Sequence, residues 1–301
     1  MASLRDIRKH ISSVKSIKQI THAMKMVAAA RIKRAQNAIL ASRPFAIEMN
    51  RLISDLYAEL AEGDFSCSPA AALFEERPPG GPLCLVLVTA DKGLCGSFNT
   101  NLLKAAAEWL RENRGRKLYA VVVGRKGRDF LRRLKNLDLE ISFELVGIFP
   151  KAGYAHAQLL AENIFRIYSS RRVESVTLIY NEFKSMLAQR IVAERLLPLK
   201  SHILEGGMEP GGRRGADFIF EPDKPLLLEA LLPRHVGAQL YRALLESQAA
   251  ELAARMSAME SASKNASELI EGLTLRMNKT RQAMITTELN EIVSGSEALG
   301  G

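Results

Sequence analysis

The sequence has few cysteines, few aromatic residues and no long apolar run. Its 301 residues include three cysteines and one tryptophan, and aromatic residues make up 6% of the chain. Cys67, Cys84 and Cys95 are odd in number and show no C-x-x-C spacing, so we expect unpaired thiols in a reducing compartment. No run of about 18 uncharged apolar residues occurs, so we expect no membrane-spanning helix. The first residues start a helical pattern at once, without the apolar core of a signal peptide.

The signatures of catalysis and of cofactor binding are also missing. The five histidines lie far apart, with no cysteine or carboxylate at ligand spacing, so we expect no metal site. The loop Gly93–Gly96 follows an apolar run but lacks the glycine spacing of dinucleotide and P-loop sites, which favours a tight turn. Gly124–Gly127 resembles the GXXG of KH domains, but it follows a predicted strand and does not join two helices. The sequence therefore predicts no cofactor and no catalysis by this chain alone.

What the sequence does contain is two very long amphipathic stretches at its ends, residues 4–57 and 226–294. In the C-terminal stretch, apolar and small residues step by four and three in strict alternation. This heptad pattern predicts a seam that another helix has to cover. The seam consists of Leu252, Met256, Met259, Ser263, Ala266, Ile270, Leu273, Met277, Thr280 and Met284.

The N-terminal stretch offers the partner helix. Its apolar positions begin with the same spacing, and the pattern then indicates a slip of phase before it resumes. We therefore predict an antiparallel two-helix coiled coil made of residues 1–60 and 222–295. The first run is Leu4, Ile7, Ile11 and Val14; the slip is Ile17, Ile20, Met24 and Val27; the resumed run is Ile32, Ala35, Ile39 and Met49.

Between these stretches, apolar runs alternate with amphipathic segments over residues 80–205. Continuous apolar runs are typical of strands buried on both faces of a parallel sheet. The alternation predicts an inserted, Rossmann-like open α/β domain with right-handed crossovers. We expect strands at 83–89, 118–124, 139–146 and 173–180, an edge strand at 189–196, and helices at 99–111, 126–134 and 154–168.

The net charge of +9 is confined to one part of the chain. Residues 1–43 contain ten lysines or arginines and a single acidic residue, Asp6, and charges cancel over the rest. A localised basic helix indicates an acidic partner, which is a nucleic acid, an anionic membrane or an acidic protein collar. A solvated helix face is the plainer alternative.

Motifs at both ends and in the insert together resemble one family, the γ subunits of F-type ATP synthases. His22 and Met284 differ from the residues that the family's motifs have at these positions, and both differences are small. The motifs are Ile7–Ile11, Ile20–Ala29, Ser42–Phe45, Thr89–Gly96, Phe220–Pro222 and Asn278–Val293.

The resemblance implies a rotor without catalytic groups of its own. In this family the coiled coil stands inside a hexamer of α and β subunits, and its foot turns with the membrane c-ring and an ε subunit. It implies no nucleic-acid partner, and contact with the membrane only through the complex. The first motif lies close to the first residue of the sequence and no cysteine occurs near Gly206–Gly215, so we expect neither a presequence nor a cysteine-bearing insertion. We therefore expect a peripheral location on the cytoplasmic face of a bacterial plasma membrane.

The resemblance also assigns contact residues by motif. Met24 and Lys25 fall on the turn of the N-terminal helix that faces the collar, although Met24 also fits the helix seam. A catch for a β subunit falls near the end of the C-terminal helix, and a loop of the insert faces the β subunit. The catch consists of Arg281, Gln282, Thr286 and Glu288, and the loop carries Asp91, Lys92 and Cys95.

Two other functions stay open on the residues alone. A nucleic-acid-binding coiled coil with an α/β head would show a steep dependence of affinity on salt. An enzyme would bind its ligand at the carboxyl ends of the strands, near Asp91 or Gly124.

Overall fold

The structure, a computed structural model, describes residues 3–60, 73–186, 188–199 and 223–299. The chain forms two compact units, one of residues 1–30 and 255–301 and the other of residues 31–254. Two long helices, α1 (Leu4–Leu60) and α6 (Lys224–Leu299), contribute to both units. Each helix contains one internal proline, Pro44 in α1 and Pro233 in α6, and neither proline ends its helix.

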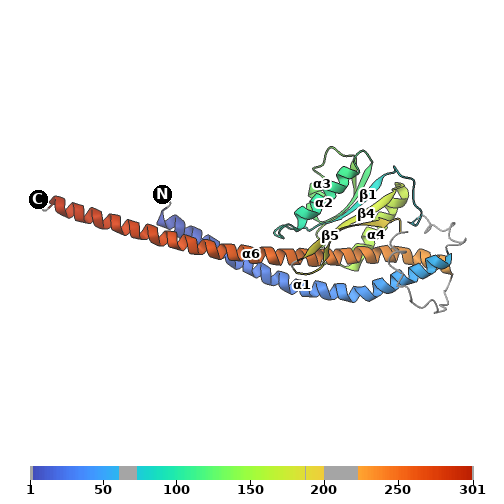
Figure 1. Cartoon of the computed structure of the whole chain (residues 1–301), viewed down its shortest axis with the longest axis horizontal. Coiled ribbons are helices and arrows are strands. Elements are labelled where there is room, and N and C mark those ends of the chain that lie inside the picture. Colours follow the sequence, from blue (N-terminus) through green and yellow to red (C-terminus); the bar gives the residue numbers. More distant parts are fainter. Residues whose placement is uncertain (1–2, 61–72, 187, 200–222, 300–301) are drawn as a thin grey trace. The chain divides into compact units, whose positions relative to one another are not determined.

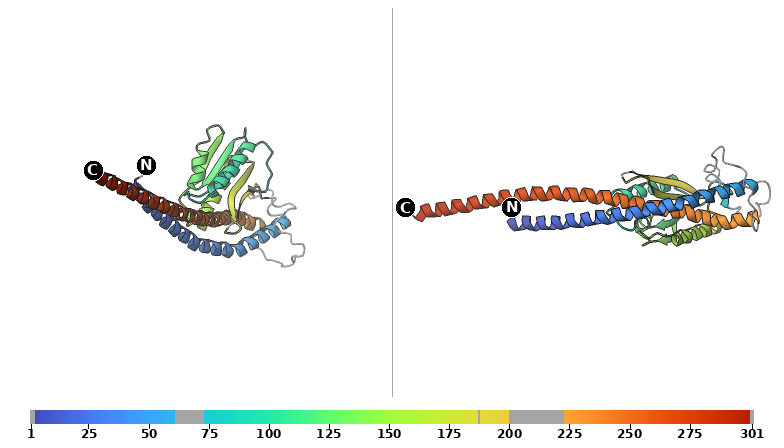
Figure 2. Two further views of the ribbon diagram at one scale, coloured as in Figure 1. Left: turned by 60° about the vertical axis from the view of Figure 1, so that its left-hand side comes forward. Right: turned by 90° about the horizontal axis from the view of Figure 1, so that it is seen from below.

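The first unit is the predicted coiled coil, in which the N-terminal half of α1 and the C-terminal half of α6 lie side by side (Figures 1 and 2). Lys25 of α1 forms an ion pair with Glu260 of α6, with 2.6 Å between Nζ and Oε1. The predicted seam of α6 is confirmed within this unit, because each of its positions as far as Thr280 is buried or half-buried. These positions are Met256, Met259, Ser263, Ala266, Ile270, Leu273, Met277 and Thr280.

The predicted slip of phase in α1 is wrong. The heptad steps continue without interruption, with Lys18 and Lys25 at two of the seam positions. A lysine suits such a position because its apolar stem covers the seam while its ammonium group reaches water or, at Lys25, a carboxylate. The seam of α1 in this unit is formed by Ile7, Ile11, Val14, Thr21 and Ala28, whereas Ile17, Ile20 and Val27 are exposed.

The second unit contains the predicted α/β domain. Its five strands follow the order β3-β2-β1-β4-β5, in which the first four are parallel and β5 runs antiparallel to β4 at one edge. Every residue of β1 and β2 is buried, as their continuous apolar runs predicted. The bounds are β1 Leu83–Val88, β2 Leu118–Val123, β3 Leu139–Leu145, β4 Ser175–Phe183 and β5 Gln189–Leu197.

Helices cover both faces of this sheet (Figure 1). One face packs against α2 (Phe98–Glu112) and α3 (Arg125–Leu131), with Trp109 of α2 at the edge of that core. The other face packs against α4 (Tyr154–Ser170) and against the halves of α1 and α6 that belong to this unit. Parts of both long helices therefore belong to the core of this domain.

The junction between β1, β2 and α3 is unusually close. Thr89, just after β1, donates a hydrogen bond to the carbonyl of Val123 at 2.9 Å, and its hydroxyl accepts one from the Gly127 amide at 2.8 Å. Gly124 has a φ of +89°, and a Cβ added there would lie 2.1 Å from the Thr89 carbonyl oxygen. Only glycine fits a position that combines this backbone conformation with this contact.

The two described cysteines are buried, which determines their reactivity. Burial raises the pKa of the Cys84 thiol to about 12, so almost no Cys84 thiolate exists near neutral pH in the folded chain. We predict that a Cys67→Ser variant shows no thiol reactive toward a disulfide reagent at about pH 8. In concentrated urea both thiols should react, because unfolding exposes them and returns the pKa of Cys84 toward about 8.5. Rapid labelling of the folded variant would contradict the burial of Cys84 in β1 or of Cys95 in the loop after it.

Candidate partner-binding surfaces on the terminal helices

The last turns of α6 carry side chains that no other helix of the coiled-coil unit covers. Counting along antiparallel helices from the Lys25–Glu260 pair places Leu4 roughly level with Arg281, so α1 begins where the final part of α6 leaves it. Figures 1 and 2 show α6 extending past the start of α1 within this unit. All residues from Arg281 to Gly295 are exposed.

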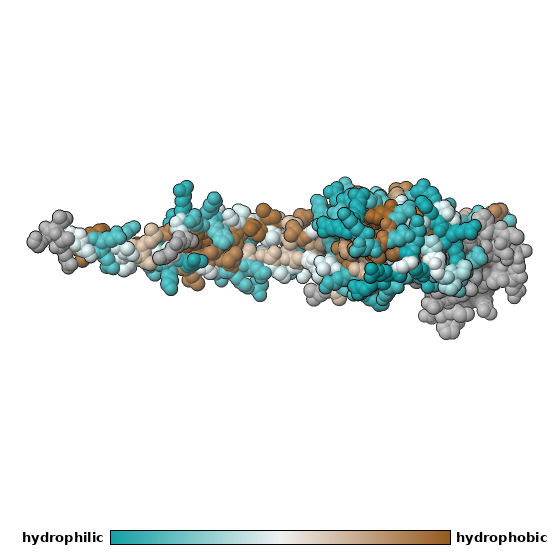
Figure 3. Space-filling model, turned by 90° about the horizontal axis from the view of Figure 1, so that it is seen from above, coloured by the Kyte–Doolittle hydropathy of each residue, from teal (hydrophilic) through white to brown (hydrophobic). Residues whose placement is uncertain are grey.

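This extension of α6 is apolar on one side. Ile285, Leu289 and Ile292 step by four and three residues, and therefore share one face of the helix. All three are exposed, as are Met284 and Val293. Figure 3 shows apolar surface along the terminal helices, broken by hydrophilic side chains. An apolar stripe left in water is typical of a surface that another protein covers. The predicted seam ends at Met284 and does not include this stripe, although the spacing of the stripe is present in the sequence.

The four residues predicted to form a catch lie on this extension, and all four are exposed. The Thr286 hydroxyl donates to the Gln282 carbonyl at 3.0 Å, inside the helix itself. Within the described part of the chain, the side chains of Arg281, Gln282 and Glu288 have no hydrogen-bond or ion-pair partner. These three side chains are therefore free to bind another molecule.

A second uncovered stripe lies on α1. Ile17 and Ile20 are 52% and 59% exposed, and Val27 continues the same face. Met24, predicted to face the collar, is half-buried between this stripe and the seam. Lys25, its predicted companion, is engaged with Glu260. The structure therefore brings Met24 to the edge of an apolar face and ties Lys25 into the coiled coil.

Basic side chains surround the α1 stripe. Among the described side chains of residues 3–34, every lysine and arginine except Lys25 is exposed, and none of the exposed ones has an ion-pair partner within the described chain. A surface that is both apolar and basic suits a protein partner with an acidic, partly apolar lining. The exposed cations are Arg5, Arg8, Lys9, Lys15, Lys18, Arg31, Lys33 and Arg34.

In the predicted loop after β1, some side chains contact the rest of the domain and others are exposed. Asp91 accepts hydrogen bonds from the amides of Arg125 at 3.2 Å and Gly147 at 2.9 Å, so it holds together the segments that follow three neighbouring strands. Cys95 is buried and accepts a hydrogen bond from Asn99. The exposed members are Lys92 and Leu94, of which Leu94 is 66% exposed at a φ of +63°. Leu94 was missed by sequence reasoning, because a single apolar loop residue carries no periodic signal.

No group of three or more potential metal ligands occurs in residues 3–60, 73–186, 188–199 and 223–299. None of the helices described there is long and apolar enough to cross a bilayer.

Fold and surfaces together define the class of the protein: a coiled-coil subunit of a larger assembly, built on an α/β head. A family model described as ATP synthase matches residues 3–299. The ATP synthase γ chain of Elusimicrobium minutum is 46% identical over 302 residues, with 99% of each chain covered. The γ chain of Anaeromyxobacter sp. (strain Fw109-5) is 44% identical and covers 99% of this chain and 100% of its own. The chain belongs to the family of ATP synthase γ chains.

Solved structures agree with this assignment. A chain of the central stalk and c-ring structure of the Tetrahymena thermophila mitochondrial ATP synthase is 27% identical, with a TM-score of 0.58, and the match covers 81% of this chain and 99% of that one. A chain of the Euglena gracilis enzyme shares the fold at a TM-score of 0.67 and 20% identity, covering 98% and 94%. The nucleic-acid alternative finds no support among these relatives.

Proposed function

We propose that this chain is the central-stalk rotor of a proton-translocating F-type ATP synthase, and that its terminal helices turn inside a collar of α and β subunits. The observation that carries the proposal is the pair of uncovered apolar faces on α1 and α6, set among unpaired basic side chains. In a coiled coil that is surrounded only by water, polar residues would occupy these positions. The partners are the α and β subunits, an ε subunit and the c-ring.

The proposed shaft can act differently on the three catalytic sites because its own faces differ. A two-helix coiled coil has different faces: one carries Ile17 and Ile20, and another carries lysines and arginines. In a threefold collar, the three catalytic sites therefore meet different surfaces at any moment. The shaft biases each site only by the difference in its contacts with the open and closed forms of that site. Rotation of the shaft then moves this bias from one site to the next.

In this proposal the chain supplies contacts and no catalytic group. The nucleotide chemistry belongs to its partners, and the chain regulates ATP hydrolysis and proton flow by its orientation. It reaches the membrane only through the assembled complex. We place that complex on the plasma membrane of a bacterium, with this subunit on the cytoplasmic face.

Co-expression with α and β subunits of a close relative tests the proposal. We expect one copy of this chain to co-purify with three αβ pairs and to raise their ATPase activity, because the shaft drives the sites through their cycle. A chain that ends at Thr280 is the matched variant, since it keeps the paired part of the coiled coil and loses the exposed extension. It should assemble less tightly. Recovery of the full chain with nucleic acid and without α and β subunits would refute the proposal.

A further inference from the structure

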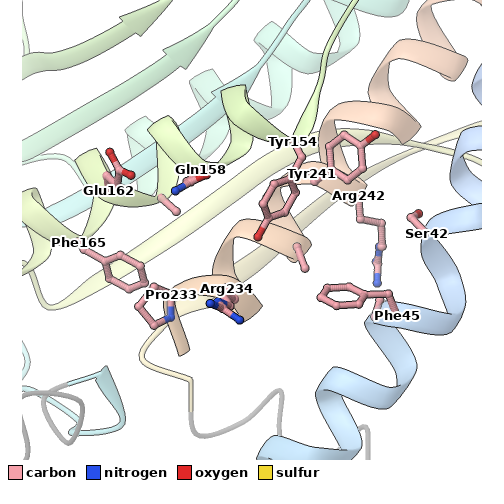
Figure 4. Close-up of a pocket in the computed structure, with 13 residues that line it drawn as sticks. Ser42, Phe45, Tyr154, Gln158, Glu162, Phe165, Pro233, Arg234, Tyr241 and Arg242 are labelled. Atoms are coloured by element: carbon pink, nitrogen blue, oxygen red, sulfur yellow. The ribbon is translucent and has the colours of Figure 1, made fainter. Parts of the chain in front are cut away.

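The second unit contains a groove whose lining residues have no assigned role in the proposed rotor. It has a volume of about 700 Å³ and lies between α1, α4 and α6 (Figure 4). This volume lies within the range of small-molecule sites, which is about 300–1,000 Å³. Most of its lining is apolar. The groove therefore has the size and the lining of a site for one small organic molecule.

Aromatic rings form the walls of the groove. Phe45 comes from α1, Tyr154 and Phe165 from α4, and Tyr241 from α6. Tyr154 and Tyr241 pack edge to face, with 5.8 Å between ring centroids and an interplanar angle of 84°. Phe45 is 54% exposed, so this ring is left largely in water. Rings brought together from three helices and left accessible favour a flat aromatic guest, because offset and edge contacts add to the burial of apolar area.

Two arginines of α6 set the charge of the groove. Arg242 is held in place by the Tyr180 hydroxyl at 3.2 Å and by Glu246 at 3.4 Å. Arg234 is exposed and has no hydrogen-bond or ion-pair partner in the described chain. Figure 4 shows Arg234 between Pro233 and Phe45, whereas Glu162, the acidic residue of the lining, points away from it. An unpaired guanidinium beside aromatic rings selects a guest whose anionic group presents two or more oxygens to its N–H donors.

We propose that this groove binds a small aromatic acid, with its ring system against Phe45, Phe165 and Tyr241 and its carboxylate or sulfonate on Arg234. The absence of a side chain at Gly237 supports the arrangement. A Cβ built there would lie 3.3 Å from the Tyr154 hydroxyl oxygen, so glycine lets Tyr154 keep its place on Tyr241. Such a guest would join α4 to both long helices, and so would stiffen the unit at the point where the helices meet the sheet.

Two dyes that differ only in the anion test the proposal on the full chain. The probes are 8-anilinonaphthalene-1-sulfonate and its neutral counterpart N-phenyl-1-naphthylamine, titrated by fluorescence and by calorimetry. We expect a saturable site for the sulfonate with a Kd on the order of 10–100 µM, which is the range for a guest of this size. Arg234→Gln should weaken binding of the sulfonate about 5- to 10-fold and leave binding of the neutral dye unchanged. Phe45→Ser should weaken both.

The control is Arg114→Gln, which removes the same charge from an exposed position of the chain outside the groove. It should change neither titration. Circular dichroism of each variant checks that the fold is kept, and the exposed positions of Phe45 and Arg234 make this the expected result. Equal effects of Arg234→Gln and Arg114→Gln on the sulfonate, or no effect of Phe45→Ser on either dye, would overturn the proposal.

Discussion

Replacing Gly124 by alanine is expected to destabilise the α/β domain by about 2–5 kcal/mol. The backbone at Gly124 has a φ of +89°, which costs an L-residue about 1–2 kcal/mol. In addition, the new Cβ would meet the Thr89 carbonyl oxygen at 2.1 Å, and that atom belongs to a backbone held by the Val123 and Gly127 hydrogen bonds. Relief of the contact requires β1 and β2 to separate at their ends, which adds a repacking cost of about 1–3 kcal/mol.

Gly115 provides the matched control for this substitution. Its φ is +92°, close to that of Gly124, but an added Cβ would have no neighbour within 4 Å. Gly115→Ala should therefore show the backbone cost alone, about 1–2 kcal/mol. Urea unfolding followed by fluorescence of Trp109, the single tryptophan, reports on the layer that α2 forms with the sheet. If both variants lose the same stability, the close approach of Gly124 to Thr89 is not as described.

Replacing Arg281 and Gln282 together by alanine is expected to reduce the ATPase activity of the assembled complex about 10-fold or more. Both side chains are exposed on the α6 extension, without partners in the described chain. In the proposed rotor they bind a β subunit, and loss of hydrogen bonds to a charged group costs about 1.5–3 kcal/mol. That cost corresponds to about a 10- to 100-fold change in the contact equilibrium.

The control for this pair is Lys264→Ala with Asn265→Ala. These two residues are also a cation followed by an amide, exposed on α6, but they lie where α1 accompanies the helix. We expect this variant to keep its activity within about 2-fold, as most surface substitutions do. Circular dichroism of each isolated chain should be unchanged. Equal activity of the two double variants would show that Arg281 and Gln282 do not form the proposed contact with a β subunit.

The fold could be predicted from the sequence where one periodicity dominated. Continuous apolar runs such as Leu83–Val88 gave the parallel strands, because only a strand covered on both faces needs that composition. The heptad steps gave the seam of α6 as far as Thr280. The end of α3 was less predictable. The helix ends at Leu131 and not at 134, since an amphipathic pattern continues through a turn as readily as through a helix.

The slip of phase was mispredicted for a physical reason. The exposed stripe lies beside the seam and has the same spacing as the seam; it consists of Ile17, Ile20 and Val27. From the sequence, an apolar face that binds another protein therefore cannot be told from one that packs against α6. The seam seen in the structure includes Lys18, Thr21 and Lys25. These residues are polar, so a pattern of apolar residues does not include them. A lysine in a seam is recognised only once its stem and its carboxylate partner are seen.

The loop after β1 shows a similar limit. The motif singled out Asp91, Lys92 and Cys95 together, yet Asp91 and Cys95 form inward contacts that hold the loop, while Lys92 faces water. A motif shows which residues occur together. It does not show which of them stabilise the loop and which of them contact another protein. We therefore propose that contact with a β subunit is made by Lys92 and by Leu94.

The proposed rotation of this chain can be observed on single molecules. The α and β subunits would be fixed to a surface, and a bead would be attached through a cysteine introduced at Arg114, in the exposed turn just after α2, in a Cys67→Ser background. The account predicts ATP-driven rotation of the bead in one direction, in three equal steps per turn, because one asymmetric shaft serves three sites in sequence. A complex that hydrolyses ATP at the full rate while the bead stays still would contradict the account.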